Sequence, residues 1–434
     1  MCIRDRNISV LQQLRLNLGS DSVRDDVVAF GSAQADTFDL STSGTVAHVA
    51  RRGGVRVDIH EAGSNGETLT VNTYEDADTI NVNATLGGIT TTVNGGNGPD
   101  TVNVGSEAST SGSGNLKGIV GSLIVNGDYG SDVLNPDDTG NATGATDGEL
   151  TGTTINGSGI GAGITYDSIK TLTINLGSGD DSFLVTGTHG TDTQISGGAG
   201  GDTIDVEAVS GATTILGSSG DDTLRVNNAV GPETNTLSAA VVLDGQAGAD
   251  NYDVNIFGDG GSIVSVFDSG TSATETDTLT IDGTGNRDEF VLRASNVADV
   301  GFVAALHGEQ VERVNYDVRL ENLIVDTAAG SDVVTLGRGE DGFAIADELN
   351  TDISVLDRFS VRLGEDNVQD DVVVDGAATA ETFDVSTDGS IFRVARRADS
   401  IVDIHESGTG FGSCLLYTSP SPRDRTRSRM PSSA

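Results

Sequence analysis

A strand–turn–strand pattern recurs along this chain about every twenty residues, and this repetition constrains the fold more than any other feature. Three consecutive copies begin at Leu172, Thr193 and Thr213 and read LTINLGSGDDSFLV, TQISGGAGGDTIDV and TTILGSSGDDTLRV. Apolar and polar residues alternate on both sides of a turn rich in Gly and Asp, which is typical of half-buried strands. One short strand pair cannot bury its own apolar face, but pairs stacked coil upon coil bury a continuous row of Val, Ile and Leu. The pattern therefore predicts an all-β chain, a parallel β-helix or a closely related β-solenoid.

A β-sandwich array is the architectural alternative. The intervals of 21 and 20 residues between Asp181, Asp202 and Asp222 disfavour it, because equivalent turns of a sandwich lie further apart in sequence. Residues 140–164 and 258–276 depart from the spacing, so we expect irregular coils or loops there. No stretch shows sustained helical periodicity with caps, so helices are expected to be few and short.

A second repeat has a period of 345 residues. Val10 to Gly63 aligns without a gap on Val355 to Gly408, with 29 of 54 positions identical. We therefore interpret residues 7–354 as one unit of a tandem array, and residues 355–413 as the start of the next unit. The expectation is a fragment of a very large parent protein.

Both ends of the chain resemble translated sequencing adapter rather than natural protein. Residues 1–6 read MCIRDR, and residues 414–434 begin CLLYTSPSPRD. They carry both Cys and both Met residues of the chain, so residues 7–413 contain neither. That composition excludes a disulfide scaffold, a thiol nucleophile and a zinc–thiolate site. It is consistent with an extracellular or cell-surface location.

The charge restricts the partners. The whole chain has a net charge of −41, and residues 7–413 keep 18 basic and 63 acidic residues, a net charge of −45. Nucleic acid and anionic lipid need a cationic surface, so neither is an expected partner. No apolar run approaches twenty residues, so no membrane insertion is predicted in this segment. Cations are the favoured partners.

Two turns match the pattern GGxGxDxUx, in which U is a large apolar residue: Gly95–Asn103 and Gly197–Asp205. Here the chain resembles the RTX family, the hemolysin-type calcium-binding repeat proteins. In that family the glycines adopt positive φ, and Asp carboxylates with loop carbonyls hold Ca²⁺ between coils. Family members run the nonapeptide back to back, whereas this chain has one copy per coil. The resemblance implies a calcium site at Gly95, Gly96, Gly98, Asp100, Asp181, Gly197, Gly198, Gly200, Asp202, Gly220, Asp222 and Asp250.

Electrostatics favours cations independently of the resemblance. If the turn aspartates stack on one edge, neighbouring carboxylates lie roughly 5 Å apart. Their repulsion is about 0.8 kcal/mol per pair in bulk water and about 3 kcal/mol at an effective dielectric constant of 20. Ca²⁺ suits irregular cages of carbonyl and carboxylate oxygens. Two alternatives stay open: Asp as an ordinary turn residue that bonds to the backbone, and a salt-adapted surface screened by monovalent cations.

Evidence for catalysis is thin. His60 and His405 occupy the same position of successive units in VDIHE, without the second His of a metalloprotease helix, and are read as strand residues. The Arg51–Arg52 and Arg396–Arg397 pairs are expected to neutralise nearby acids. The first hypothesis is a calcium-stabilised structural or adhesive segment of a large secreted bacterial protein, with cell-surface glycans or other cells as partners. The alternative is a parallel β-helix lyase or hydrolase acting on acidic polysaccharide. Tandem duplication favours the first, because catalytic domains seldom occur in such arrays.

Overall fold

The described part of the chain is almost entirely β-structure. The only helical segment within it is the 3₁₀ turn η1 (Leu116–Gly118), and no described helix is long and apolar enough to cross a membrane. The prediction of an all-β solenoid fold is therefore confirmed. The computed structural model describes residues 2–3, 13–19, 23–60, 66–108, 112–228, 236–258, 260, 262–270, 275–295, 297, 299–307, 310–336, 358–363, 370–375, 383–388, 391–396, 401–406 and 413–417.

The chain divides into two compact units, which are described separately. Unit 1 comprises residues 1–204 and 209–219, and unit 2 comprises residues 205–208 and 220–434. Strand β19 (Thr203–Val206) and strand β20 (Ala208–Val209) contain residues of both units.

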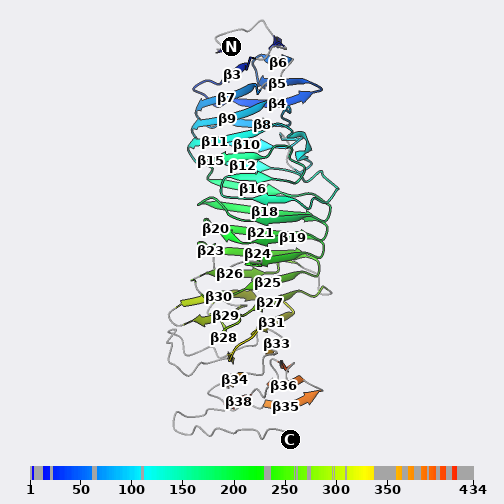
Figure 1. Ribbon diagram of the computed structural model, residues 1–434, viewed down its shortest axis with the longest axis vertical. Coiled ribbons are helices and arrows are strands. Elements are labelled where there is room, and N and C mark those ends of the chain that lie inside the picture. Colours follow the sequence, from blue (N-terminus) through cyan, green and yellow to red (C-terminus); the bar gives the residue numbers. More distant parts are fainter. Residues whose placement is uncertain are drawn as a thin grey trace. The chain divides into compact units, whose positions relative to one another are not determined.

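In unit 1, most strands stack in parallel in two ladders of paired strands (Figure 1). The first ladder contains β3 (Asp26–Phe30), β7 (Thr68–Glu75), β9 (Thr90–Asn97), β11 (Leu123–Tyr129) and β15 (Ile164–Asp167). The second contains β4 (Thr37–Ser43), β8 (Thr79–Val82), β10 (Thr101–Val104), β12 (Val133–Pro136), β16 (Thr171–Asn175), β18 (Asp192–Ala199) and β21 (Thr213–Ser219).

Antiparallel strands interrupt this stack in two places. β13 (Gly148–Leu150) and β14 (Thr154–Asn156) pair antiparallel within residues 140–164, and β14 continues antiparallel onto β15. The sequence predicted an irregular coil there. Near the start of the unit, β4, β5 (Val46–Arg51) and β6 (Arg56–His60) form an antiparallel meander. The remaining strands of unit 1 are β1 (Cys2–Ile3), β2 (Gln13–Asn17) and β17 (Ser182–Val185).

Unit 2 is built in the same way. One parallel ladder contains β22 (Thr223–Val226), β25 (Asn251–Asn255), β27 (Thr278–Asp282), β31 (Asn322–Asp326), β33 (Arg358–Leu363) and β37 (Ile401–Glu406). The other strands are β23 (Thr236–Leu237), β24 (Val241–Ala247), β26 (Ile263–Phe267), β28 (Glu289–Ala294), β29 (Val300–His307), β30 (Gln310–Asp317), β32 (Val333–Leu336), β34 (Asp371–Asp375), β35 (Phe383–Asp388), β36 (Ile391–Arg396) and β38 (Ser413–Tyr417). Residues 258–276, where irregularity was expected, contain the regular strand β26, which pairs in parallel with β24 and β30.

The strand pairing follows the 345-residue repeat. Gln13 lies opposite Arg56 in the β2–β6 pair, and Arg358 lies opposite Ile401 in the β33–β37 pair. The antiparallel pairs β4–β5 and β35–β36 also agree, because Phe38 faces Arg51 and Phe383 faces Arg396. Each partner is displaced by the same 345 positions, so the described strands of residues 358–405 repeat the local pairing of residues 13–60.

Alternation along each strand builds the core. Val71, Val93 and Val125 occupy one register column of the first ladder and are fully buried. Their neighbours face outward and form an amide ladder, in which Asn94 donates to Asn72 and Asn126 donates to Asn94, each at 2.7 Å. Coil stacking in unit 1 therefore combines backbone pairing, buried aliphatic rows and side-chain amide bonds.

The register can be tested on β12, where Leu134 is fully buried and its neighbour Val133 is partly exposed. We expect Leu134→Ala to lower the free energy of unfolding by about 2–5 kcal/mol, because it leaves a cavity. Val133→Ala should cost less than about 1 kcal/mol. Urea midpoints at constant m-value measure both. Equal losses would show that the strand is registered differently.

Candidate functional site: aspartate ladders at the turns

In the turns that match the calcium-repeat pattern, backbone conformation explains two of the glycines. In the turn that ends at Asp100, Gly96 has φ of 96° and Gly98 has φ of 134°. The position of Gly96 holds Asp128 in the next coil, at φ of 67°, which an Asp side chain tolerates. A φ as large as that of Gly98 is essentially restricted to glycine. The fourth position of the turn is therefore under a stronger constraint than the second.

The first glycine of the turn is needed for a different reason. A Cβ atom on Gly95 would approach Oδ2 of Asp100 to 2.6 Å, and one on Gly31 would approach Oδ2 of Asp36 to 2.7 Å. The same clash occurs between Gly197 and Asp202. Glycine five residues before the aspartate thus leaves room for a carboxylate that folds back into the turn.

These carboxylates bind the backbone of the neighbouring coil. In unit 1, the amide N–H of Asp78 donates to Oδ1 of Asp100 at 2.8 Å, and that of Asp100 donates to Oδ1 of Asp132 at 2.9 Å. We call such a series of carboxylates, each bound to the amide of the preceding one, an aspartate ladder. The rungs in unit 1 are Asp36, Asp78, Asp100 and Asp132 in one ladder and Asp181 and Asp202 in another.

Unit 2 also contains two ladders. The amide of Asp222 donates to Asp250, and the amide of Asp250 donates to Asp277, both at 2.8 Å. The first ladder continues to a glutamate, since Asp277 N–H donates to Oε2 of Glu321 at 2.8 Å. The rungs of the second are Asp288, Asp332 and Asp370.

Several rungs are buried, and one carboxylate oxygen of each lacks a hydrogen-bond partner. Asp100, Asp132 and Asp250 are at most 2% exposed, and Oδ2 of each makes no hydrogen bond. Burial, reinforced by neighbouring aspartates, raises the pKa of Asp100 and Asp250 to about 6, although the backbone N–H bond opposes it. The same cause raises the pKa of Asp277 to about 7. A ladder of this kind is therefore partly protonated near neutral pH.

A ladder that starts beside an antiparallel meander begins with a cationic or hydrogen-bonding partner instead. Arg51 on β5 donates from Nε to Oδ1 of Asp36 at 2.6 Å. His307 on β29 bonds through Nε2 to Oδ1 of Asp288 at 2.7 Å. Arg52 pairs with Asp39, so the expectation that Arg51 and Arg52 neutralise nearby acids is confirmed. The side chains of Arg396 and Arg397 lie outside the described part.

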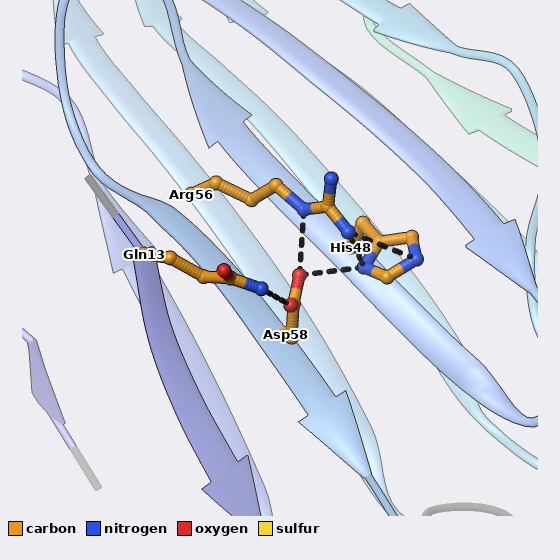
Figure 2. A network of polar contacts seen from close by, with 4 residues as sticks. All are labelled: Gln13, His48, Arg56 and Asp58. Atoms are coloured by element: carbon orange, nitrogen blue, oxygen red, sulfur yellow. Dashed lines mark hydrogen bonds and ion pairs between the residues drawn. The ribbon is translucent and has the colours of Figure 1, made fainter.

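A second polar cluster surrounds Asp58 on β6 (Figure 2). Figure 2 shows Gln13, His48 and Arg56 converging on its carboxylate, with His48 Nδ1 at 2.7 Å and Arg56 Nε at 2.6 Å from Oδ1. Burial alone would raise the pKa of Asp58, but hydrogen bonds from Arg56, Gln13 and His48 outweigh it and hold the pKa at about 2.

The repeat conserves the acid of this cluster and changes its partners. Asp403 is fully buried, like Asp58, and accepts hydrogen bonds from Nε and Nη2 of Arg393, which replaces His48. His60, the histidine that the sequence pattern singled out, lies on β6 and its carbonyl accepts the amide of Leu18. In both versions a buried carboxylate pairs with an arginine, which suits a structural role.

All five aspartates of the predicted calcium site are ladder rungs. The structure joins Asp181 to Asp202 and Asp222 to Asp250 as successive rungs, with Asp100 in a third ladder. The sequence pattern did not identify the other rungs. For Asp36, the available signal was Gly31, five residues earlier. Rungs absent from the predicted site are Asp36, Asp78, Asp132, Asp277, Asp288, Glu321, Asp332 and Asp370.

The donor set of the ladders does not fit a calcium ion in this conformation. Oδ1 of each internal rung accepts a backbone N–H, whose positive end repels a cation, and Oδ2 is enclosed beside the turn glycine. Among the described residues, no group of three or more His, Cys, Asp or Glu side chains lies close enough to hold a metal ion. Calcium binding by these turns stays a prediction.

Gly95 offers a test of the close packing between glycine and carboxylate. Gly95→Ala should lower the free energy of unfolding by several kcal/mol, because its Cβ meets Oδ2 of Asp100. Gly190→Ala is the matched control, since a Cβ there meets nothing within 4 Å. The double variant Gly95→Ala/Asp100→Ala should cost less than the sum of its parts. Additive losses in chemical denaturation would contradict the packing.

The raised pKa values predict a pH dependence. The pKa of Asp100 is about 6 in the folded chain against a reference value of 3.8, so folding takes up protons between about pH 4 and pH 6. Stability therefore falls as the pH rises through this window. We expect unfolding of residues 7–413 to require more urea at pH 5 than at pH 8, at constant ionic strength.

Asp100→Asn should reduce this loss, whereas the exposed Asp167→Asn should leave it unchanged. A chain that becomes more stable from pH 5 to pH 8 would contradict the buried, proton-binding ladder.

Comparison with known proteins adds no relative. No protein-family model matches the chain, and no curated protein is significantly similar to it. The resemblance to the calcium-binding repeat proteins therefore rests on the turn sequences alone.

Proposed function

We propose that this chain is a structural segment of a large secreted or cell-surface bacterial protein, in which stacked coils act as a spacer or support for adhesion. The aspartate ladders carry the proposal, because they bind each coil to the next through groups of the chain itself. Buried carboxylates are costly unless they are hydrogen-bonded, and here the preceding coil supplies the donor. A coil whose buried carboxylate needs a donor from the preceding coil is stable only within a stacked series. A spacer consists of such a series.

The internal duplication supports the same role. The described strands of residues 13–60 and 358–405 share their pairing at a constant offset, so the pattern of coils can be extended by repetition. Cell-surface glycans or other cells are the partners we propose for the outer surface. The adhesive part of the proposal rests on analogy with other secreted repeat proteins.

Calcium is a second candidate partner. It is favoured by the turn sequences and by the Oδ2 atoms of Asp100, Asp132 and Asp250, which are buried without a hydrogen bond. Coordination would require the turns to rearrange, since those atoms are enclosed and Oδ1 is engaged with the backbone. We therefore propose that the fold forms without calcium, and that cations act on it mainly by screening the acidic surface.

Thermal unfolding of residues 7–413, followed by circular dichroism in EGTA, tests this proposal. We expect a β-type spectrum without calcium, and the same rise in melting temperature with Ca²⁺, Mg²⁺ or NaCl at matched ionic strength. A β-type spectrum that appears only with Ca²⁺ would overturn the proposal and favour calcium coordination at the turns. Asp100→Asn in the same experiment shows whether the ladder contributes to any calcium response.

A further inference from the structure

A lysine, an asparagine and an aspartate meet beside η1 in unit 1, apart from the ladders. Lys117 Nζ donates to Oδ1 of Asn141 at 2.8 Å, and Asn141 Nδ2 donates to Oδ2 of Asp138 at 2.8 Å. Asn141 is 4% exposed and Asp138 is 2% exposed. An amine, a carboxamide and a buried carboxyl group are thus aligned in one chain of hydrogen bonds.

The local backbone fixes all three groups. Asn115 caps η1 through its side chain, which accepts the amide of Lys117 at 2.9 Å. The amide of the preceding residue, Leu116, donates to Oδ1 of Asp138 at 2.7 Å and thereby holds η1 against the loop after β12. The stem of Lys117 lies over Gly159, where a Cβ would approach its Cγ to 2.9 Å. The exposed lysine is therefore directed to the buried asparagine.

We propose that Lys117 and Asn141 become joined by an intramolecular isopeptide bond. Nζ, after losing one proton, forms a bond to Cγ of Asn141, and the bond between Cγ and Nδ2 breaks. The lysine ammonium and the carboxamide become a secondary amide and one ammonium ion, so the step needs no oxidant, cofactor or further reactant. The reacting groups are already in contact, which removes most of the entropic cost of bringing them together.

Two other groups assist the step. The backbone N–H of Thr143 donates to Oδ1 of Asn141 at 3.2 Å and stabilises the negative charge that develops on this oxygen during attack. Asp138 is the catalytic residue: Oδ2 takes a proton from the attacking nitrogen and delivers it to Nδ2, which leaves as ammonia. Burial raises the pKa of Asp138, which favours the protonated carboxyl group that this transfer passes through.

The bond would tie η1, between β10 and β11, to the loop after β12. It would add a covalent link to coils that are otherwise held by hydrogen bonds and packing. The proposal does not depend on the spacer function or on calcium, because it uses different residues.

The lysine content makes the test simple, since the chain contains only two lysines, Lys117 and Lys170. We expect the intact mass of purified residues 7–413 to fall short of the sequence mass by one ammonia. Digestion with the lysine-specific protease Lys-C in denaturant should then cut after Lys170 and not after Lys117. Tandem mass spectrometry should identify the branched peptide that links residues 117 and 141.

Variants separate the bond from the fold. Lys117→Arg keeps the charge and a hydrogen-bond donor but forms no such bond, so it should show full mass. Asn141→Ala should show full mass and be cut after Lys117, and Asp138→Asn should slow or abolish the mass loss. Lys170→Arg is the control and should still lose ammonia. A wild-type chain with full mass that is cut after both lysines would overturn the proposal.

Discussion

The hydrogen bond from the backbone amide of one aspartate to the carboxylate of the next is the interaction on which the turns of this protein depend. It fixes the distance between successive coils at the point where the chain reverses. Within the described residues, it is the one hydrogen bond that the buried carboxylates of Asp100 and Asp132 accept. A carboxylate without it would be buried at a cost of several kcal/mol. The glycine five residues before Asp100 and before Asp132 leaves room for the carboxylate, because a Cβ atom there would clash with its Oδ2.

The same arrangement explains how the coils of a highly acidic chain can stack on one another. Rungs lie inside the turns, where burial shifts their pKa values upward and reduces their charge near neutral pH. Where a ladder starts beside an antiparallel meander, Arg51 or His307 takes the place of the missing backbone donor. Repulsion between stacked carboxylates is thus relieved by protons, by backbone amides and by side-chain partners such as Arg51, which lessens the need for bound metal ions.

Sequence reasoning predicted the fold well and the candidate site in part. Alternation around the turns, as in residues 193–206, determines which side chains are buried, so the all-β solenoid could be predicted. The turn aspartates were recognised as a stacked set, because their spacing is regular. Their direction could not be predicted, since the same Gly–Asp pattern serves a carboxylate facing a cation and one facing a neighbouring amide. The contact between Lys117 and Asn141 gave no sequence signal, because it joins a short 3₁₀ turn to a loop outside the repeated strands.

Amide hydrogen exchange of Asp78 tests the ladder most directly, followed by NMR on residues 7–413 labelled with ¹⁵N at aspartate. The account predicts that Asp100→Ala, which removes the acceptor, speeds exchange at the Asp78 amide by about tenfold or more. The Asp181 amide, bound to Asp202 in the other ladder of unit 1, should keep its rate and serves as the internal control. Unchanged protection at Asp78 in the variant would show that the carboxylate of Asp100 is not its partner, and would contradict the ladder.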